Sequence, residues 1–332
     1  MTTLWTDVVV VARHDTTPRI AVFDLARADG DELWEYEPGA HIDVQVGEAG
    51  PVRQYSLCGP PGIRKQYRIA VLNEAASRGG SRAMHALAEG DTLRIAAPRN
   101  RFGLTSARRH LLLAGGIGIT PLLAMAQSLD ATGGDYHLHY CARSRTEAAF
   151  VPELENNPRV TLHFDDEAPG QRLDLRRDVG EPAADTAVYV CGPGGFMDYA
   201  LGRAAELGWP ASALHKERFS ASPPGAGSAG SAGSAGSAGS DGGDADGFTV
   251  RISSTGAEYP VPGDQSVLDV LLANGFDAPY SCGQGICGEC IVRVRAGEPE
   301  HLDDVLTDDE RAEGLFTPCS SRSRTPILEL EL

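Results

Sequence analysis

The sequence predicts a multidomain chain with an antiparallel β-barrel, a Rossmann-like α/β domain and a C-terminal β-grasp domain. Three observations predict this order. Short β-branched runs without a helical period come first, strands alternating with helical patterns follow, and a Gly, Ser and Ala repeat then separates a last strand-rich segment. We expect a barrel at 1–105, an α/β domain at 106–220, a flexible linker at 221–246 and the last domain at 247–332.

The composition restricts the classes of partner. Among 332 residues, 46 acidic side chains against 29 basic ones give a formal net charge of −17 at pH 7. A surface of that sign disfavours nucleic acid and anionic membranes as partners. The sequence has no long apolar run and no visible export signal, so we expect a cytoplasmic protein. We also expect it to act as a monomer.

The first segment indicates a small barrel, because short strand-like runs follow one another between Gly, Pro and Asp turns. The expected strands are 7–12, 19–25, 41–46, 67–72 and 92–97. Between two of them lie Arg53, Tyr55 and Ser56, in the run Arg-Gln-Tyr-Ser. A guanidinium, an aromatic ring and a hydroxyl together suit a ligand with a flat ring and a phosphate.

A glycine turn before a helix expected at 83–87 strengthens that prediction. Gly79, Gly80 and Ser81 come directly ahead of the helix. Backbone N–H groups at such a turn favour an anion, and the serine adds a hydroxyl. We expect a phosphate site here, although paired glycines also suit an ordinary turn.

The second segment has the pattern of a doubly wound parallel sheet. Its expected strands are 110–114, 136–140, 160–164 and 187–191, and a helix is expected at 122–129. Gly115, Gly116 and Gly118 form the first turn from strand to helix, where a dinucleotide pyrophosphate binds in such folds. Pro121 replaces the third glycine of the usual G-x-G-x-x-G fingerprint, so the turn departs from the standard motif.

Four cysteines in the last segment predict an iron–sulfur centre. Cys282, Cys287 and Cys290 follow a C-x4-C-x2-C spacing, and Cys319 lies further along the chain. This is the ligand pattern of a plant-type [2Fe–2S] cluster, whereas structural zinc usually takes two close pairs of ligands. Strand patterns at both ends of the segment, with a helical stretch at 267–273, follow the order of a β-grasp fold.

The order of these motifs resembles the ferredoxin-reductase superfamily, and more narrowly the phthalate dioxygenase reductase type, over nearly the whole chain. The resemblance implies an FMN site with Ser56 near flavin N5 and the glycine–serine loop on the phosphate. The residues that it assigns to FMN are Arg53, Tyr55, Ser56, Val71, Gly79, Gly80 and Ser81.

The same resemblance covers the nucleotide motif, because Gly-Gly-Ile-Gly-Ile-Thr-Pro is similar to that family's own version. It implies that Thr120 approaches the flavin, that Cys191 shapes the nicotinamide pocket, and that Phe219 packs over the isoalloxazine. No paired His and carboxylate are evident, so we do not expect Cys191 to be a nucleophile. The nucleotide-binding residues implied are Gly115, Gly116, Gly118, Thr120, Arg143, Cys191, Gly192, Pro193 and Phe219.

The function implied by the resemblance is an NAD(P)H-dependent reductase that passes hydride to FMN and single electrons through the [2Fe–2S] cluster to a terminal oxygenase. A Rieske non-haem iron oxygenase is the expected acceptor, and a cytochrome P450 is the alternative. Arg143 suits a 2′-phosphate, yet similar turns in the family serve NADH, so we expect NADH and leave NADPH open. An iron–sulfur carrier or redox sensor without flavin activity, and a flavin-only reductase, also stay open.

Two features of the last third have more than one interpretation. Its acidic residues, Asp303 and Asp308 among them, form either a docking face for a basic partner or a solvated surface. The regular repeat within 221–246 reflects either natural low complexity or an engineered join.

Overall fold

The computed structural model describes residues 4–47, 50–74, 79–219, 247–276, 278, 280, 283, 285, 286 and 288–332. The chain divides into two compact units, Met1–Phe219 (unit 1) and Ser220–Leu332 (unit 2). The predicted linker at 221–246 lies outside the described residues. The boundary expected at 105 falls inside unit 1, in the connection between its two sheets, and stays a prediction.

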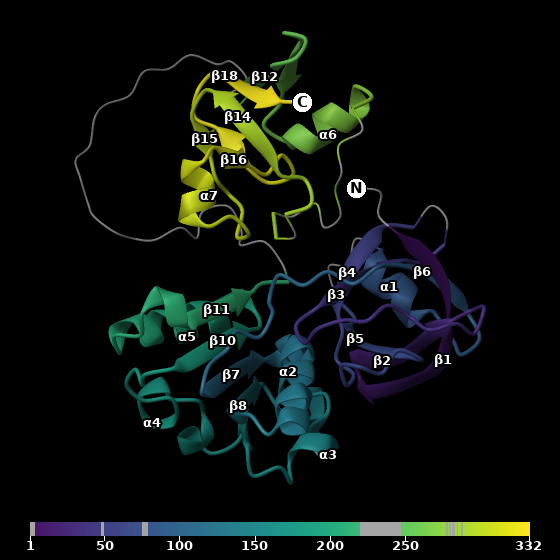
Figure 1. Cartoon of the computed structure of the whole chain (residues 1–332), viewed down its shortest axis with the longest axis vertical. Coiled ribbons are helices and arrows are strands. Elements are labelled where there is room, and N and C mark those ends of the chain that lie inside the picture. Colours follow the sequence, from purple (N-terminus) through teal and green to yellow (C-terminus); the bar gives the residue numbers. More distant parts are fainter. Residues whose placement is uncertain are drawn as a thin grey trace. The chain divides into compact units, whose positions relative to one another are not determined.

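Unit 1 begins with a six-stranded antiparallel sheet in the order β4-β3-β6-β1-β2-β5. A bridge between Leu57, after β4, and Ile69 of β5 closes the sheet into a barrel (Figure 1). The run Arg53–Ser56, predicted to lie between two strands, is therefore part of a strand itself, β4. The elements are β1 Trp5–Thr17, β2 Ile20–Arg27, β3 His41–Gln45, β4 Val52–Ser56, β5 Tyr67–Leu72, α1 Gly80–His85 and β6 Thr92–Ala96.

A parallel sheet in the order β11-β10-β7-β8-β9 completes unit 1. The neighbours of β7 are β8, which follows it in sequence, and β10, which comes much later. This reversal of strand order is a topological switch point, where α/β sheets bind nucleotides. The strands are β7 Arg109–Gly115, β8 Asp135–Ala142, β9 Val160–Phe164, β10 Thr186–Cys191 and β11 Leu214–Glu217.

Helices cover both faces of this sheet, because successive residues of each strand point to opposite sides. Figure 1 shows α2 on one side of the sheet and α4 and α5 on the other. Leu112 and Ala114 belong to the buried cluster of α2, whereas Leu111 and Leu113 belong to that of α4 and α5. The α-helices are α2 Ile119–Thr132, α3 Val151–Leu154, α4 Leu175–Asp178 and α5 Gly194–Glu206, and short 3-10 turns occur at Gly116–Gly118, Arg145–Glu147, Pro169–Gln171 and Ala211–Ala213.

The barrel and the parallel sheet share one hydrophobic core. Ile20, Val22 and Ala70 of the barrel belong to the same buried cluster as Leu122 and Met125 of α2. This shared cluster explains why the first two predicted domains form one compact unit.

Unit 2 contains a five-stranded mixed sheet in the order β13-β12-β18-β14-β16, with β12 and β18 parallel at its centre. Helix α6 packs on it through Val267, Val270 and Leu271, which is a β-grasp arrangement (Figure 1). The elements are β12 Phe248–Ile252, β13 Glu258–Val261, α6 Val267–Ala273, β14 Val292–Ala296, β15 Pro299–Glu300, α7 Asp308–Ala312, β16 Leu315–Phe316, β17 Arg322–Ser323 and β18 Ile327–Glu331.

Candidate cofactor sites

The predicted flavin motifs meet in the barrel, although they are far apart in the sequence. The Arg53 side chain, on β4, lies directly over Gly80 at the start of α1: a Cβ added to Gly80 would overlap Arg53 Cγ and stand 3.0 Å from its Nε. Gly79 has φ +103°, a conformation that favours glycine. Ser81 is nearly buried, and its hydroxyl accepts a hydrogen bond of 3.2 Å from the Glu74 backbone N–H. The turn and the arginine thus lie side by side in the barrel.

Ser56, at the end of β4, is buried, and among the described residues its hydroxyl has no hydrogen-bond partner. A buried hydroxyl without a partner costs free energy unless a ligand supplies the bond. The neighbouring Tyr55 is half-buried, and burial raises the pKa of its phenol to about 12, so it stays neutral. Val71 differs from these residues, because its side chain is fully buried in the barrel core.

The two predicted nucleotide motifs also come together, at the switch point between β7 and β10. A Cβ on Gly118 would overlap the Cys191 carbonyl group and stand 2.6 Å from Gly192 N. Gly115 is similarly close to the ring of Phe196, because a Cβ added to Gly115 would stand 2.7 Å from Phe196 Cδ1. Only glycine allows the turn after β7 to approach the end of β10 so closely.

Cys191 is fully buried, and burial raises the pKa of its thiol well above the ordinary range. The group is therefore a neutral thiol, which agrees with a shaping role and not with a nucleophile. Thr120 is also buried and donates its hydroxyl hydrogen to the Ile117 carbonyl at 3.0 Å, which fixes the first turn of α2. Pro193 precedes α5 as its N-cap, and Phe219 packs partly buried against the core of unit 1.

Two arginines follow β8, and they have different surroundings. Arg145 makes an ion pair of 2.9 Å with Glu155 and lies over the Phe164 ring, 5.0 Å from its centroid. Arg143 is exposed at the carboxyl edge of the sheet. Arg145 is exposed as well, so the two arginines differ in the ion pair and ring contact of Arg145 and not in their exposure.

Two of the four predicted cluster ligands can be placed. Cys290 and Cys319 are buried, without a disulfide, in a small cluster with Leu268 and Ala278. The Gly285 backbone N–H donates to Cys319 Sγ over 3.1 Å. Buried, unbridged thiols with a backbone donor at sulfur fit thiolates that hold iron. Cys282 and Cys287 lie outside the described residues.

Comparisons with known proteins cover the whole chain. Residues 250–324 match the 2Fe-2S iron-sulfur cluster binding domain family. The vanillate O-demethylase oxidoreductase of Pseudomonas putida is 47% identical, over 98% of this chain and 99% of that protein. The structure of phthalate dioxygenase reductase matches with a TM-score of 0.73 and 32% identity, over 99% of this chain and 98% of the other. The chain belongs to the phthalate dioxygenase reductase type.

A further structural match is to part of a cytochrome P450 enzyme. An intact type IV self-sufficient cytochrome P450 monooxygenase matches with a TM-score of 0.78 and 38% identity, over 99% of this chain and 41% of the other. The predicted fold class is confirmed, and so is the class of enzyme, an oxidoreductase that serves an oxygenase. The family match also supports the predicted [2Fe–2S] cluster.

The structure adds Glu217, which the sequence analysis did not select. It pairs in register with Cys191, between β11 and β10. Among the described residues its Oε2 atom has no hydrogen-bond partner, and burial raises the pKa of the carboxyl to about 8. No local sequence signal distinguishes Glu217, because it is an ordinary acidic residue at the end of a short strand and only the pairing of β11 with β10 places it beside Cys191.

No helix within the described residues of the reductase has the length and the apolar character that crossing a bilayer requires.

Proposed function

We propose that the reductase takes a hydride from NADH onto FMN and passes single electrons through its [2Fe–2S] cluster to a Rieske non-haem iron oxygenase. One observation carries this proposal: Gly118 packs against Cys191 and Gly192 at the switch point of the parallel sheet. The contact joins both nucleotide motifs within the compact unit that also contains the Arg53 and Gly80 pair. An electron carrier without flavin activity has no use for such a junction.

Residues of the barrel would hold FMN. Arg53 and Ser81, with the turn at Gly79 and Gly80, suit the phosphate, because a guanidinium and backbone N–H groups both bind anions. The phenol of Tyr55 stays neutral and suits the flat ring or its edge. The Ser56 hydroxyl, buried without a partner in the described structure, is available to the flavin at N5.

Residues at the switch point would hold the nucleotide. The glycine turn formed by Gly115, Gly116 and Gly118 suits the pyrophosphate, and the buried thiol of Cys191 limits the nicotinamide pocket. Gly192 and Pro193 shape the entrance at the start of α5, and Phe219 with Thr120 would border the flavin. FMN, when bound, accepts two electrons as hydride and releases them singly, as a one-electron cluster requires. Hydride transfer needs no general acid, so a neutral Cys191 is sufficient.

We propose NADH as the donor, with NADPH as the outcome that would contradict this choice. Arg143 is exposed at the position where a 2′-phosphate would lie. If steady-state rates with NADPH exceed those with NADH, the proposal for the donor is wrong. Replacement of Arg143 by Ala would then reduce the NADPH rate alone.

The acceptor has a second candidate, because the P450 fusion protein matches the whole reductase. We propose a Rieske oxygenase for an aromatic or similar small substrate, since the full-length relative carries the name vanillate O-demethylase oxidoreductase. We further propose that the reductase is a cytoplasmic monomer. Reconstitution with a purified Rieske oxygenase and with a purified P450, compared by coupled product formation, distinguishes the two acceptors.

Acid release of the flavin, with identification by mass, tests the cofactor directly. We expect FMN, and FAD in the extract would contradict the proposal. Cys290→Ser should abolish cytochrome c reduction, because the cluster is lost, while ferricyanide reduction through the flavin survives. If both reactions survive, the cluster does not carry the electrons and a flavin-only reductase is the correct function.

A further inference from the structure

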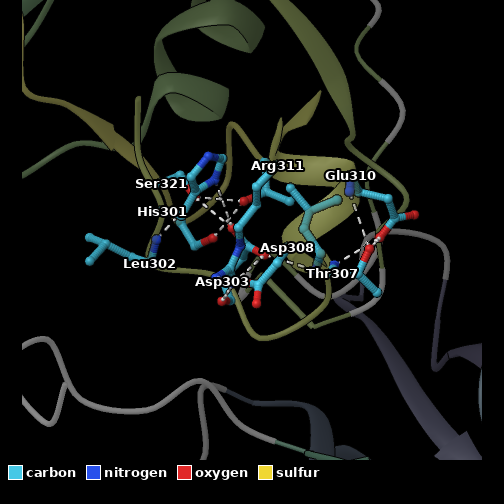
Figure 2. A network of polar contacts seen from close by, with 11 residues as sticks. His301, Leu302, Asp303, Thr307, Asp308, Glu310, Arg311 and Ser321 are labelled. Atoms are coloured by element: carbon cyan, nitrogen blue, oxygen red, sulfur yellow. Dashed lines mark hydrogen bonds and ion pairs between the residues drawn. The ribbon is translucent and has the colours of Figure 1, made fainter. Parts of the chain in front are cut away.

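A buried carboxylate lies beside the cluster loop of unit 2. Asp303 lies in the segment between β15 and α7 (Figure 2). Its side chain has no exposed surface. This burial contradicts the prediction that Asp303 belongs to an acidic surface of the last third, so that prediction is wrong for this residue. Asp308, the first residue of α7, is fully exposed and fits that surface.

Several donors hold the Asp303 carboxylate. Oδ2 accepts 2.9 Å from the Leu306 backbone N–H, and Oδ1 accepts 3.2 Å from the Ser321 hydroxyl. Arg311 of α7 donates to Oδ2 at 3.4 Å and to the Asp303 carbonyl oxygen at 2.8 Å (Figure 2). His301 Nδ1 lies 3.4 Å from Oδ1. Burying a charge is expensive even when it is paired, so this arrangement is weak as a source of stability and strong as a constraint on geometry.

The constrained segment contacts the cluster loop through Gly285. The Asp304 backbone N–H donates to the Gly285 carbonyl oxygen over 3.0 Å. A Cβ on Gly285, which has φ +72°, would stand 3.1 Å from Asp303 Cα and would overlap the Ser320 hydroxyl. The Gly285 peptide is therefore fixed between the Asp303 segment and the residue that follows Cys319.

The same glycine makes the N–H···S bond to Cys319 over 3.1 Å. A hydrogen bond to a ligating sulfur withdraws negative charge, which favours the reduced cluster and raises its reduction potential. A displacement of the Asp303 segment would move the Gly285 peptide, and this bond would lengthen. The connection from Asp303 to the cluster sulfur thus passes through two backbone hydrogen bonds.

We propose that Asp303 is a positioning residue for the cluster, holding the Gly285 N–H on Cys319 Sγ and so raising the reduction potential of the cluster. This proposal rests on one part of the proposed function, namely that Cys319 ligates a [2Fe–2S] cluster. The hydrogen bonds of the Asp303 side chain go to Leu306, Arg311 and Ser321, and none of these residues is a predicted ligand of the cluster. It acts through the backbone of the segment that it anchors.

A through-space effect of charge makes a different prediction. A negative charge near a cluster opposes the arrival of an electron, so removing the charge raises the potential. Loss of the N–H···S bond, in contrast, lowers the reduction potential. A substitution that keeps the charge but shifts the segment therefore isolates the positioning role.

The test compares Asp303→Glu with two controls in the full-length reductase containing both cofactors. Asp303→Glu keeps the charge and adds a methylene to a fully buried site. Asp308→Asn removes an exposed charge near Arg311, and Thr307→Ala removes the cap of α7. The measurements are the midpoint potential of the cluster, from a dye-mediated titration, and the EPR spectrum of its reduced form.

We expect Asp303→Glu to shift the midpoint potential to a more negative value and to change the EPR line shape. Neither control should make the potential more negative, and ferricyanide reduction by NADH should be unchanged in all three variants. If Asp303→Glu loads its cluster and has the wild-type potential, or a less negative one, the proposal is wrong. If the wild-type protein contains no cluster, it is the proposed function that fails.

A second variant covers the case in which Asp303→Glu does not retain its cluster. Ser321→Ala removes one donor from Asp303 Oδ1, together with the hydrogen bonds of the same hydroxyl to the Leu302 N–H and the Thr317 hydroxyl, and nearly keeps the size of a buried side chain. We expect a shift in the same direction and of smaller size. A wild-type potential in Ser321→Ala would then overturn the proposal.

Discussion

The two units of the reductase position their cofactor sites by different means. In unit 1 the backbone itself makes the close contacts, because Gly118 and Gly80 lie where any side chain would collide. In unit 2 a buried charge, Asp303, holds a loop against the cluster segment. The parallel sheet supplies rigid strand ends on which glycines are sufficient, whereas Gly285 is held by a segment that depends on the Asp303 side chain. Substitutions should therefore damage the two units in different ways.

The largest effect on activity is expected from Gly118→Ala, which tests the backbone contact of unit 1. The added Cβ would collide with the backbone of Cys191 and Gly192, which cannot move as a flexible side chain can. We expect the free energy of unfolding of unit 1 to fall by about 1–3 kcal/mol, and NADH oxidation to slow at least about tenfold. All three tryptophans lie in unit 1, so urea unfolding followed by tryptophan fluorescence reports this unit alone.

Gly202→Ala is the matched control for that variant. Gly202 is exposed in the middle of α5 and has no heavy atom within 4 Å of an added Cβ. This alanine should stabilise the helix by about 0.5–1 kcal/mol. Equal destabilisation by both alanines would show that the close contact at Gly118 is unimportant.

Glu217→Gln tests whether unit 1 also contains a buried acid whose ionisation costs free energy. Burial raises the pKa of Glu217 to about 8, above its ordinary 4.5, so the folded state holds a proton that the unfolded state has released between those pH values. Stability of the wild-type unit 1 should therefore fall as the pH rises from about 4.5 to about 8, by at most about 1.4 kcal/mol per pH unit. The glutamine variant should lack this slope, as measured by urea unfolding at several pH values. Parallel pH profiles for the two proteins would contradict the assignment.

A smaller effect is expected from Gly80→Ala, where the colliding group is a side chain. Arg53 can rotate away from the new methyl group, so the barrel should unfold at nearly the wild-type urea concentration. The displaced guanidinium would no longer meet the phosphate, and we expect FMN to bind about tenfold more weakly, equal to about 1.4 kcal/mol. Titration of the apoprotein with FMN, followed by flavin fluorescence, measures this. Unchanged affinity would remove Arg53 from the flavin site.

The smallest effect is expected in unit 2 from Thr307→Ala. Thr307 and Glu310 form a capping box at the start of α7, with the threonine hydroxyl accepting 3.2 Å from the Glu310 N–H. Its loss should destabilise unit 2 by about 1 kcal/mol, observed as earlier loss of cluster absorbance in urea. A destabilisation well above this value would mean that α7 supports the cluster site through further contacts besides those of Arg311.

Much of the architecture could be predicted from local patterns. The glycine turn after residue 114, the Cys-Gly-Pro run and the cysteine spacing each have a short-range signature, and the structure brings the first two together at one strand edge. Glu217 and Asp303 could not be found in this way. Each is an ordinary acidic residue in sequence, and only the fold decides that Asp303 is buried while Asp308, five positions later, is exposed. Val71 was selected by resemblance, and its side chain proves to belong to the barrel core.

The hydrophobic cluster shared by the barrel and α2 has a consequence for exchanging modules between related reductases. A chimera joined near residue 105 would divide that cluster and pair Ile20, Val22 and Ala70 with foreign side chains, so the hybrid core would have to repack. A join after Phe219 falls between compact units and leaves each core with its own partners. A different electron-carrying domain should therefore be joined after Phe219, so that the flavin and nucleotide parts stay together in one unit.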